Sequence, residues 1–218
     1  MLYVTTRNAR DAYTAHRALC ELRGPDGGLY VPFRKPNLTK SEIDALLEMP
    51  INQCVAKVIN LLFNTKLSGW DIDFSVGRNP VRLHSMGHRI TVGECWHNPE
   101  GEISYLVRKI ANRIRVKGTE EDLGDWPQIG VRIAVLFGTF GQLQRVNGEP
   151  LAKPVDVSVM SGDFIAPMAA WYARILGLPV GNIVCCCNEN SSIWELFHHG
   201  EFRTGTIAIK TELPAADV

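Results

Sequence analysis

The chain has 218 residues, enough for one large or two small domains with a substantial core. Its 23 basic and 23 acidic residues give a net charge of zero, so no excess charge argues for a nucleic-acid partner or an anionic membrane surface. No apolar stretch is long enough for a membrane span or a signal peptide, and we expect a cytoplasmic protein. Three of the six cysteines are consecutive, Cys185 to Cys187. Because neighbouring strand residues point to opposite faces, these thiols are expected to be reduced and structural rather than metal ligands.

The amino-terminal part predicts a short sheet followed by helices. In chain order the expected elements are a strand over 2–6, a helix over 11–22, a strand over 29–32, and helices over 41–49 and 54–63. The turn Asp26-Gly27-Gly28 leads into the second strand. Either Thr39 or Ser41 can cap the helix over 41–49.

The remaining part predicts alternating strands and helices. The expected elements are paired strands within 81–95, a basic helix over 103–116, an exposed loop over 117–127, a buried helix over 129–144 despite three glycines, a strand over 155–160, a helix over 166–176 with Pro167 in its first turn, a strand over 183–187 and a helix over 191–199. The repeated strand–helix order implies parallel pairing and an α/β sheet.

Four stretches of the chain resemble motifs of the threonine synthase family, and they occur in the order that the family has. They are Tyr3-Val4-Thr5-Thr6-Arg7 with Asp26-Gly27-Gly28-Leu29-Tyr30-Val31-Pro32, then Glu94-Cys95-Trp96-His97-Asn98-Pro99, then Val157-Ser158-Val159-Met160-Ser161-Gly162-Asp163-Phe164, and finally Leu176-Gly177-Leu178-Pro179-Val180 through Asn188-Glu189-Asn190 to His198-His199-Gly200. This resemblance implies the large domain of a type II pyridoxal-phosphate enzyme, related to tryptophan synthase β, with a parallel or mixed sheet flanked by helices. It also implies an amino-terminal domain over 1–80 and a reduced α/β domain over 81–218. A short charged loop between Ile114 and Asp125 stands where the family has its small substrate domain, so that domain is expected to be deleted.

The same resemblance makes Ser104 the central observation. Aligned without gaps, the family's Schiff-base lysine falls on Ser104 and the following aspartate on Tyr105. A hydroxyl cannot form an aldimine, so cofactor chemistry is expected to be lost and no cofactor is expected. Lys109 does not replace the lysine, because five residues along a helix place it about 140° away.

The third motif resembles the family's phosphate-binding loop, Val-Ser-Val-Pro-Ser-Gly-Asn-Phe-Gly-Asp. Here Asp163, Ile165 and Ala166 replace the asparagine, the second glycine and the aspartate. A carboxylate beside a phosphate is repulsive, and the simplest role for Asp163 is to cap the helix near Pro167. The candidate ligand-binding residues are His97, Ser161, Gly162, Asp163, Phe164 and Asn188.

These observations predict a pseudoenzyme with a binding or regulatory role, toward a small anion or a protein partner, in a homo-oligomer such as a homodimer. The alternative is an active pyridoxal-phosphate-dependent threonine synthase, converting O-phosphohomoserine to threonine with a displaced lysine or with residues from a second chain. A third alternative is a product that folds but has no selected role. A metal site at His198-His199 or Cys95-x-His97 lacks a coherent ligand set, and a hydrolytic triad of Ser104, His97 and Asp163 lacks a nucleophile elbow.

Overall fold

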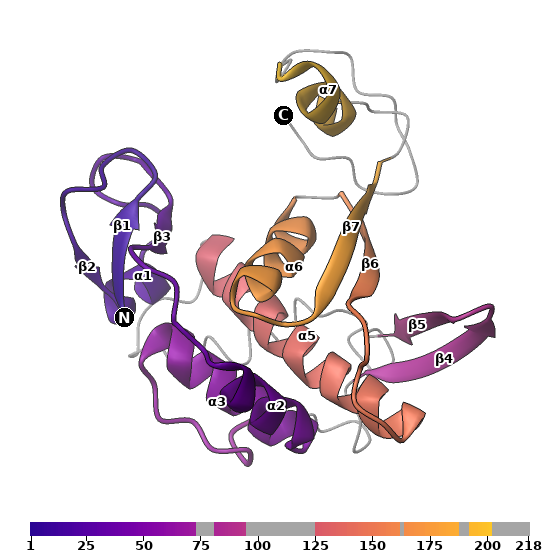
Figure 1. Ribbon diagram of the computed structural model, residues 1–218. Coiled ribbons are helices and arrows are strands. Elements are labelled where there is room, and N and C mark those ends of the chain that lie inside the picture. Colours follow the sequence, from indigo (N-terminus) through magenta and orange to yellow (C-terminus); the bar gives the residue numbers. More distant parts are fainter. Residues whose placement is uncertain (73–80, 95–124, 162–163, 188–191, 202–218) are drawn as a thin grey trace.

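The computed structural model describes residues 1–72, 81–94, 125–161, 164–187 and 192–201 (Figure 1). The elements are β1 (Leu2–Thr5), β2 (Tyr13–Thr14), α1 (Ala15–Cys20), β3 (Tyr30–Pro32), α2 (Lys40–Glu48), α3 (Ile51–Phe63), β4 (Arg82–Gly87), β5 (Ile90–Glu94), α5 (Asp125–Asn147), β6 (Val155–Met160), α6 (Ile165–Ile175), β7 (Val180–Cys186) and α7 (Ser192–His199). The helix predicted over 103–116 lies outside the described residues. None of the described helices combines the length and apolar character that a membrane span needs.

The amino-terminal sheet has the order β2-β1-β3 and is antiparallel throughout. The helix predicted over 11–22 is wrong at both ends, because Tyr13 and Thr14 pair with β1 and only Ala15–Cys20 is helical. Thr14 leaves the sheet and caps α1, since its hydroxyl accepts a hydrogen bond from the Arg17 amide at 3.3 Å. Strand pairing thus overrides the helical pattern here.

The two parts of the first motif, Tyr3–Arg7 and Asp26–Pro32, meet in this sheet. The Thr5 hydroxyl at the end of β1 donates to Oδ2 of Asp26 at 2.5 Å, and Oδ1 of Asp26 accepts from the Gly28 amide at 2.9 Å. The hydrogen bond from Thr5, with that from Gly28, lowers the pKa of Asp26. Gly27 has a φ of 76°, which glycine adopts without strain. The Asp-Gly-Gly turn therefore fixes β3 beside β1.

Thr39 begins α2 with a complete capping box. Its hydroxyl accepts from the Glu42 amide at 3.3 Å, and a Glu42 carboxylate oxygen accepts from the Thr39 amide at 2.8 Å. The structure thus selects Thr39 over Ser41 as the cap that the sequence left open.

Replacing Thr39 by alanine is expected to lower the free energy of unfolding by about 1 kcal/mol, because the amides at the start of α2 lose their acceptor. Ser41→Ala is the matched control and should leave stability within about 0.5 kcal/mol, since Ser41 is exposed and lies inside the first turn. Urea denaturation followed by circular dichroism measures both; equal losses in the two variants would contradict the assigned cap.

The long helix α5 packs against α2, α3 and α6 and forms the centre of the core (Figure 1). It begins at Asp125, so the loop predicted up to residue 127 is wrong in its last three positions. The glycines of α5 allow close approach: a Cβ on Gly138 would lie 2.6 Å from Ile51, and one on Gly141 would lie 2.4 Å from the Leu47 carbonyl oxygen. The three glycines are thus explained by packing (the third, Gly130, faces the Phe63 ring).

Trp126 connects the amino-terminal elements to the rest of the core. Its ring lies edge-on to those of Tyr3 in β1, Phe63 in α3 and Tyr172 in α6, with centroids 5.9, 6.5 and 5.1 Å away. The Tyr3 hydroxyl also donates to the Leu62 carbonyl oxygen at 2.5 Å. The tryptophan is 3% exposed, and the sheet, α3, α5 and α6 therefore share one apolar cluster.

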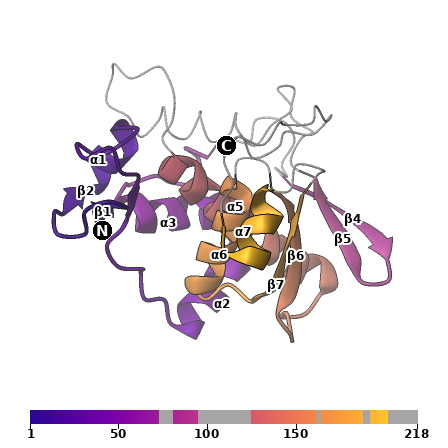
Figure 2. The same cartoon turned by 90° about the horizontal axis from the view of Figure 1, so that it is seen from above.

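The strands β6 and β7 pair in parallel, as predicted, with Val157 opposite Ile183 and Met160 opposite Cys186. The helix α6 joins them and packs against both strands on one side and α5 on the other. Gly177 ends this helical segment with a φ of 102°. The antiparallel hairpin of β4 and β5 was also predicted, and it extends away from the helices (Figure 2).

Candidate functional site

The candidate site lies at the carboxyl ends of β6 and β7, where ligands bind in open parallel sheets. Ser161 follows β6 directly and is 5% exposed. Its amide donates to the Cys186 carbonyl oxygen at 2.8 Å, and its own carbonyl accepts from the Phe164 amide at 2.6 Å. Ser161 is therefore held against β7, and the Phe164 amide immediately before α6 is bound to the same residue.

Phe164 is the residue immediately before α6 and adopts a left-handed conformation, with φ 63° and ψ 2°. A non-glycine residue in this region is uncommon and strained, and such conformations cluster at functional sites. The centre of the Phe164 ring lies 6.0 Å from that of the Phe197 ring in α7. Pro167 in the first turn has no backbone N–H, so this helix end offers fewer donors to an anion than most helix termini do.

Of the predicted site residues, the structure describes Ser161 and Phe164 and brings them together at the start of α6. The others lie outside the described residues; they are Ser104, His97, Gly162, Asp163 and Asn188. The predicted capping role of Asp163 stays a prediction for the same reason.

One described residue departs from the phosphate-binding loop that the third motif resembles. Ile165 stands where that loop has glycine, and its side chain is 5% exposed. Two described lysines lie at the opposite end of these elements. The ammonium of Lys35 donates to the Ile175 carbonyl oxygen at 3.2 Å, at the last residue of α6, and Lys153 precedes β6.

The cysteine triplet and the histidine pair occupy different environments. Cys185 and Cys186 are the last residues of β7 and are reduced, and burial raises the pKa of Cys185 to about 11. His198 stacks on Trp194 with a centroid distance of 4.0 Å, whereas Nε2 of His199 lies 3.8 Å from a Glu195 carboxylate oxygen. Within the described ranges, no three metal-ligating side chains gather around one point.

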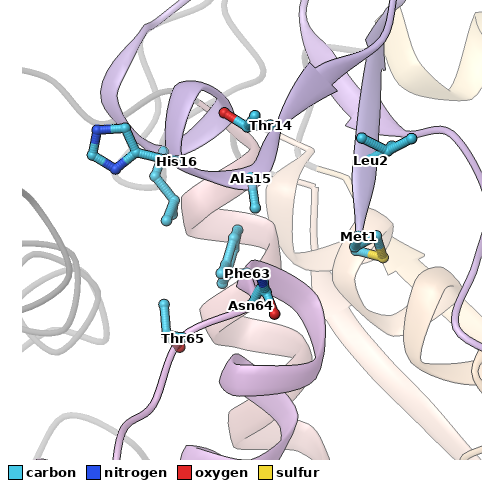
Figure 3. A pocket seen from close by; sticks show the side chains of 9 residues that line it. Met1, Leu2, Thr14, Ala15, His16, Phe63, Asn64 and Thr65 are labelled. Carbon is cyan, nitrogen blue, oxygen red and sulfur yellow. The ribbon is translucent and has the colours of Figure 1, made fainter.

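A second feature was missed from the sequence: a pocket of about 460 Å³ between β1, β2, α1 and the end of α3 (Figure 3). Its lining is contributed by Met1, Leu2, Thr14, Ala15, His16, Leu19, Phe63, Asn64 and Thr65. Three separate segments form it, so no local motif could reveal it. Asn64, in a left-handed conformation with φ 54°, ends α3 at the pocket wall.

Comparison with known proteins shows which family the amino-terminal part of the chain resembles. Residues 2–77 match the family "Threonine synthase N terminus". Threonine synthase-like 1 of Mus musculus is 26% identical over 78 residues, which cover 36% of this chain and 10% of that protein. The threonine synthase of Eremothecium gossypii is 28% identical over 94 residues, or 43% of this chain and 18% of that protein. The matched segments thus span less than a fifth of either curated relative.

The whole fold also has a counterpart. The crystal structure of threonine synthase from Escherichia coli superposes with a TM-score of 0.78 at 13% identity, covering 100% of this chain and 71% of that one. At this identity the likeness concerns the fold, and it confirms the type II pyridoxal-phosphate enzyme fold predicted from the motifs. Residues 2–77 thus resemble the amino terminus of threonine synthases, and the chain as a whole has a fold similar to that of the solved threonine synthases.

Proposed function

We propose that this protein is a threonine synthase homologue that has lost pyridoxal-phosphate catalysis and now acts by binding. The observation that carries the proposal is Ser104 at the position of the Schiff-base lysine. A serine cannot supply the primary amine that the cofactor needs. The third motif supports the same proposal, since Ile165 stands where the family's phosphate-binding loop has its second glycine.

The exposed side chains near this site favour a protein partner over a small anion as the main ligand. Phe197 is 67% exposed and Val184 53% exposed, and the described residues around Ser161 add no cation to attract an anion. Parallel strands are normally covered on both faces, whereas Met160 and Val184 leave one face of this pair open. A homo-oligomer in the cytoplasm, as expected from the sequence, would cover this face.

Threonine formation from O-phosphohomoserine tests the loss of catalysis. With excess pyridoxal phosphate, the purified protein is expected to form no more threonine than the cofactor does without protein. The threonine synthase of Escherichia coli serves as the positive control under identical conditions. Turnover by this protein that scales with its concentration would instead support the active-enzyme alternative, with a displaced or partner-supplied lysine.

A further inference from the structure

The hairpin of β4 and β5 is an exposed arm, residues 82–94, that extends away from the helices (Figure 1, Figure 2). Most of its side chains are exposed, and the apolar side chains of Met86 and Ile90 at its far end are more than half exposed. Two-stranded hairpins are marginally stable in water without further packing. An arm of this kind with an apolar tip therefore indicates a surface that another molecule covers.

The strands β6 and β7 have an open face, on the side away from α6. It consists of the exposed alternate residues of the two strands, which are Asp156, Ser158, Met160, Asn182 and Val184. Parallel strands are normally covered on both faces, so this face lacks the cover that such strands have elsewhere. Since its side chains are exposed, the arm leaves this face of its own chain uncovered.

The arm and the open face match in charge, apolar character and length. The arm begins with Arg82 and reaches Met86 four residues later. On β6, the open face begins with Asp156 and reaches Met160 four residues later. Four residues of a strand span about 13 Å in either case. Opposite charges therefore meet at one end of the contact when the two apolar side chains meet at the other.

Arg82 is available for a contact with another chain. Glu94 lies directly opposite it in the hairpin, but Oε2 of Glu94 is 2.9 Å from Nε2 of His84. No carboxylate among the described residues forms an ion pair with Arg82. The arm thus presents an exposed guanidinium at its base.

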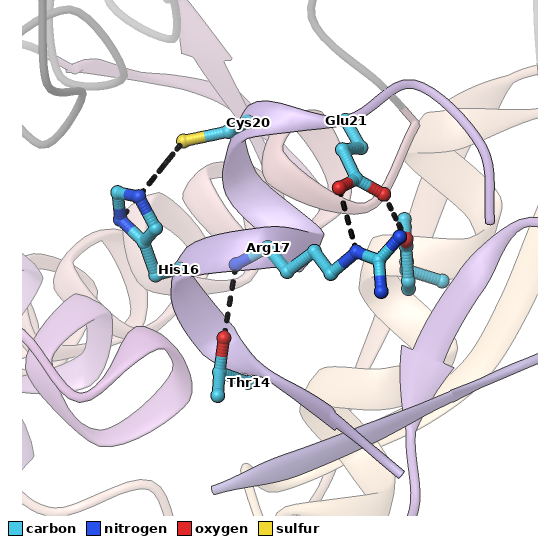
Figure 4. A network of polar contacts seen from close by, with 6 residues as sticks. Thr14, His16, Arg17, Cys20 and Glu21 are labelled. Atoms are coloured by element: carbon cyan, nitrogen blue, oxygen red, sulfur yellow. Dashed lines mark hydrogen bonds and ion pairs between the residues drawn. The ribbon is translucent and has the colours of Figure 1, made fainter. Parts of the chain in front are cut away.

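The carboxylate of Asp156 is held on the open face without a counterion. Its Oδ1 accepts a hydrogen bond from the Asn182 amide of β7 at 2.7 Å. Within the part of the chain that the structure describes, no cation pairs with it. The charges of α1 differ in this respect, because Nε of Arg17 lies 2.6 Å from Oε1 of Glu21 in the same helix (Figure 4). Arg82 and Asp156 therefore form a complementary pair that one chain leaves unused.

We propose that two copies of this chain form a two-fold dimer in which the β4–β5 arm of each lies across the open face of the other. Arg82 then faces Asp156, and Met86 covers Met160, twice in each dimer. A stable interface buries about 1,200 Å² or more, so each of the two equivalent contacts need bury only about 600 Å². This dimer deepens the homo-oligomer of the proposed function and rests on it, but it is independent of whether catalysis is lost.

Sedimentation equilibrium of the intact chain at several concentrations tests the dimer. Arg82→Glu alone and Asp156→Lys alone should each raise the dimer dissociation constant about tenfold or more, because like charges then meet at both contacts. An equimolar mixture of the two variants should dimerise about as tightly as the parent. Each mixed dimer has one parental contact and one contact with the charges exchanged, and both are attractive.

Two further variants separate the contact from folding. Asp156→Asn keeps an acceptor for the Asn182 amide and removes only the charge, and Met86→Asp removes the apolar tip. Both should weaken the dimer, whereas Leu22→Asp, at an exposed apolar position of the amino-terminal part, should not. Circular dichroism verifies that each variant is folded.

A parent protein that stays monomeric at its highest soluble concentration would overturn the proposal. A dimer unchanged by Arg82→Glu, Asp156→Asn and Met86→Asp would overturn it as well, because the chains would then associate through another surface. A mixture of the charge variants no tighter than either variant alone would contradict the pairing of the arm with the open face. Threonine formation by an intact dimer would refute only the loss of catalysis.

Discussion

Replacing Trp126 by alanine is expected to lower the free energy of unfolding by about 3–5 kcal/mol. The indole is 3% exposed and contacts the rings of Tyr3, Phe63 and Tyr172, so truncation leaves a cavity at the junction of β1, α3, α5 and α6. Because these elements share the cluster, the variant should also lose cooperativity between the amino-terminal sheet and the helices around it. Guanidinium denaturation monitored by far-ultraviolet circular dichroism measures both effects.

Trp70→Ala is the matched control, since it removes the same side chain from a position that is 94% exposed. It should change the free energy of unfolding by less than about 0.5 kcal/mol. Similar losses in the two variants would show that Trp126 does not join the elements as described. A stable Trp126→Ala variant with an unchanged midpoint would contradict the packing around this residue directly.

Gly141→Ala is expected to destabilise the protein by about 1–3 kcal/mol, although alanine is the better helix former by about 1 kcal/mol. A Cβ at this position would lie 2.4 Å from the Leu47 carbonyl oxygen and 3.2 Å from two further Leu47 backbone atoms. Backbone cannot move aside as a side-chain end can. The added methyl group would push α5 away from the Leu47 backbone. This movement would also disturb Arg145, whose Nη1 donates to the carbonyl oxygens of Leu47 and Met49 at 3.1 and 2.9 Å.

Thr139→Ala, two residues earlier in α5, provides the comparison for Gly141→Ala. The Thr139 hydroxyl donates to the Val135 carbonyl oxygen of the same helix, at 2.8 Å. Removing this hydroxyl should therefore change the free energy of unfolding by less than about 0.5 kcal/mol. Thermal unfolding of the two variants side by side measures the difference. A Gly141→Ala protein as stable as the parent would mean that α5 and the end of α2 are farther apart than described.

The sequence predicted the elements whose signals are local. The strand over 155–160 and the helix opened near Pro167 need only periodicity and turn residues, and the structure confirms them. The strand predicted over 183–187 is also present and pairs in parallel, but it runs from Val180 to Cys186. The helix predicted over 11–22 failed because pairing of Tyr13 and Thr14 with β1 is a tertiary choice. The three glycines of α5 are unfavourable for a helix when the sequence is considered alone. Their role becomes clear only in the fold, where neighbouring helices pack closely against them.

The candidate site was predictable only as far as the family resemblance reached. Ser161 and Phe164 come together as the strand–turn–helix motif implies, but the left-handed backbone of Phe164 has no sequence signal, because glycine or asparagine is the usual residue there. The pocket beside His16 could not be predicted, since residues 1–2, 14–19 and 63–65 meet only in the folded chain.

The most direct test of the lost cofactor chemistry is borohydride trapping. The purified protein is incubated with excess pyridoxal phosphate, freed of unbound cofactor, reduced with borohydride and digested for peptide mapping, with the Escherichia coli threonine synthase treated in parallel. We expect an absorbance spectrum without an aldimine band and no lysine peptide modified beyond the low, scattered labelling of exposed amines. Stoichiometric phosphopyridoxyl on one lysine of this chain, with an aldimine band that borohydride removes, would contradict it.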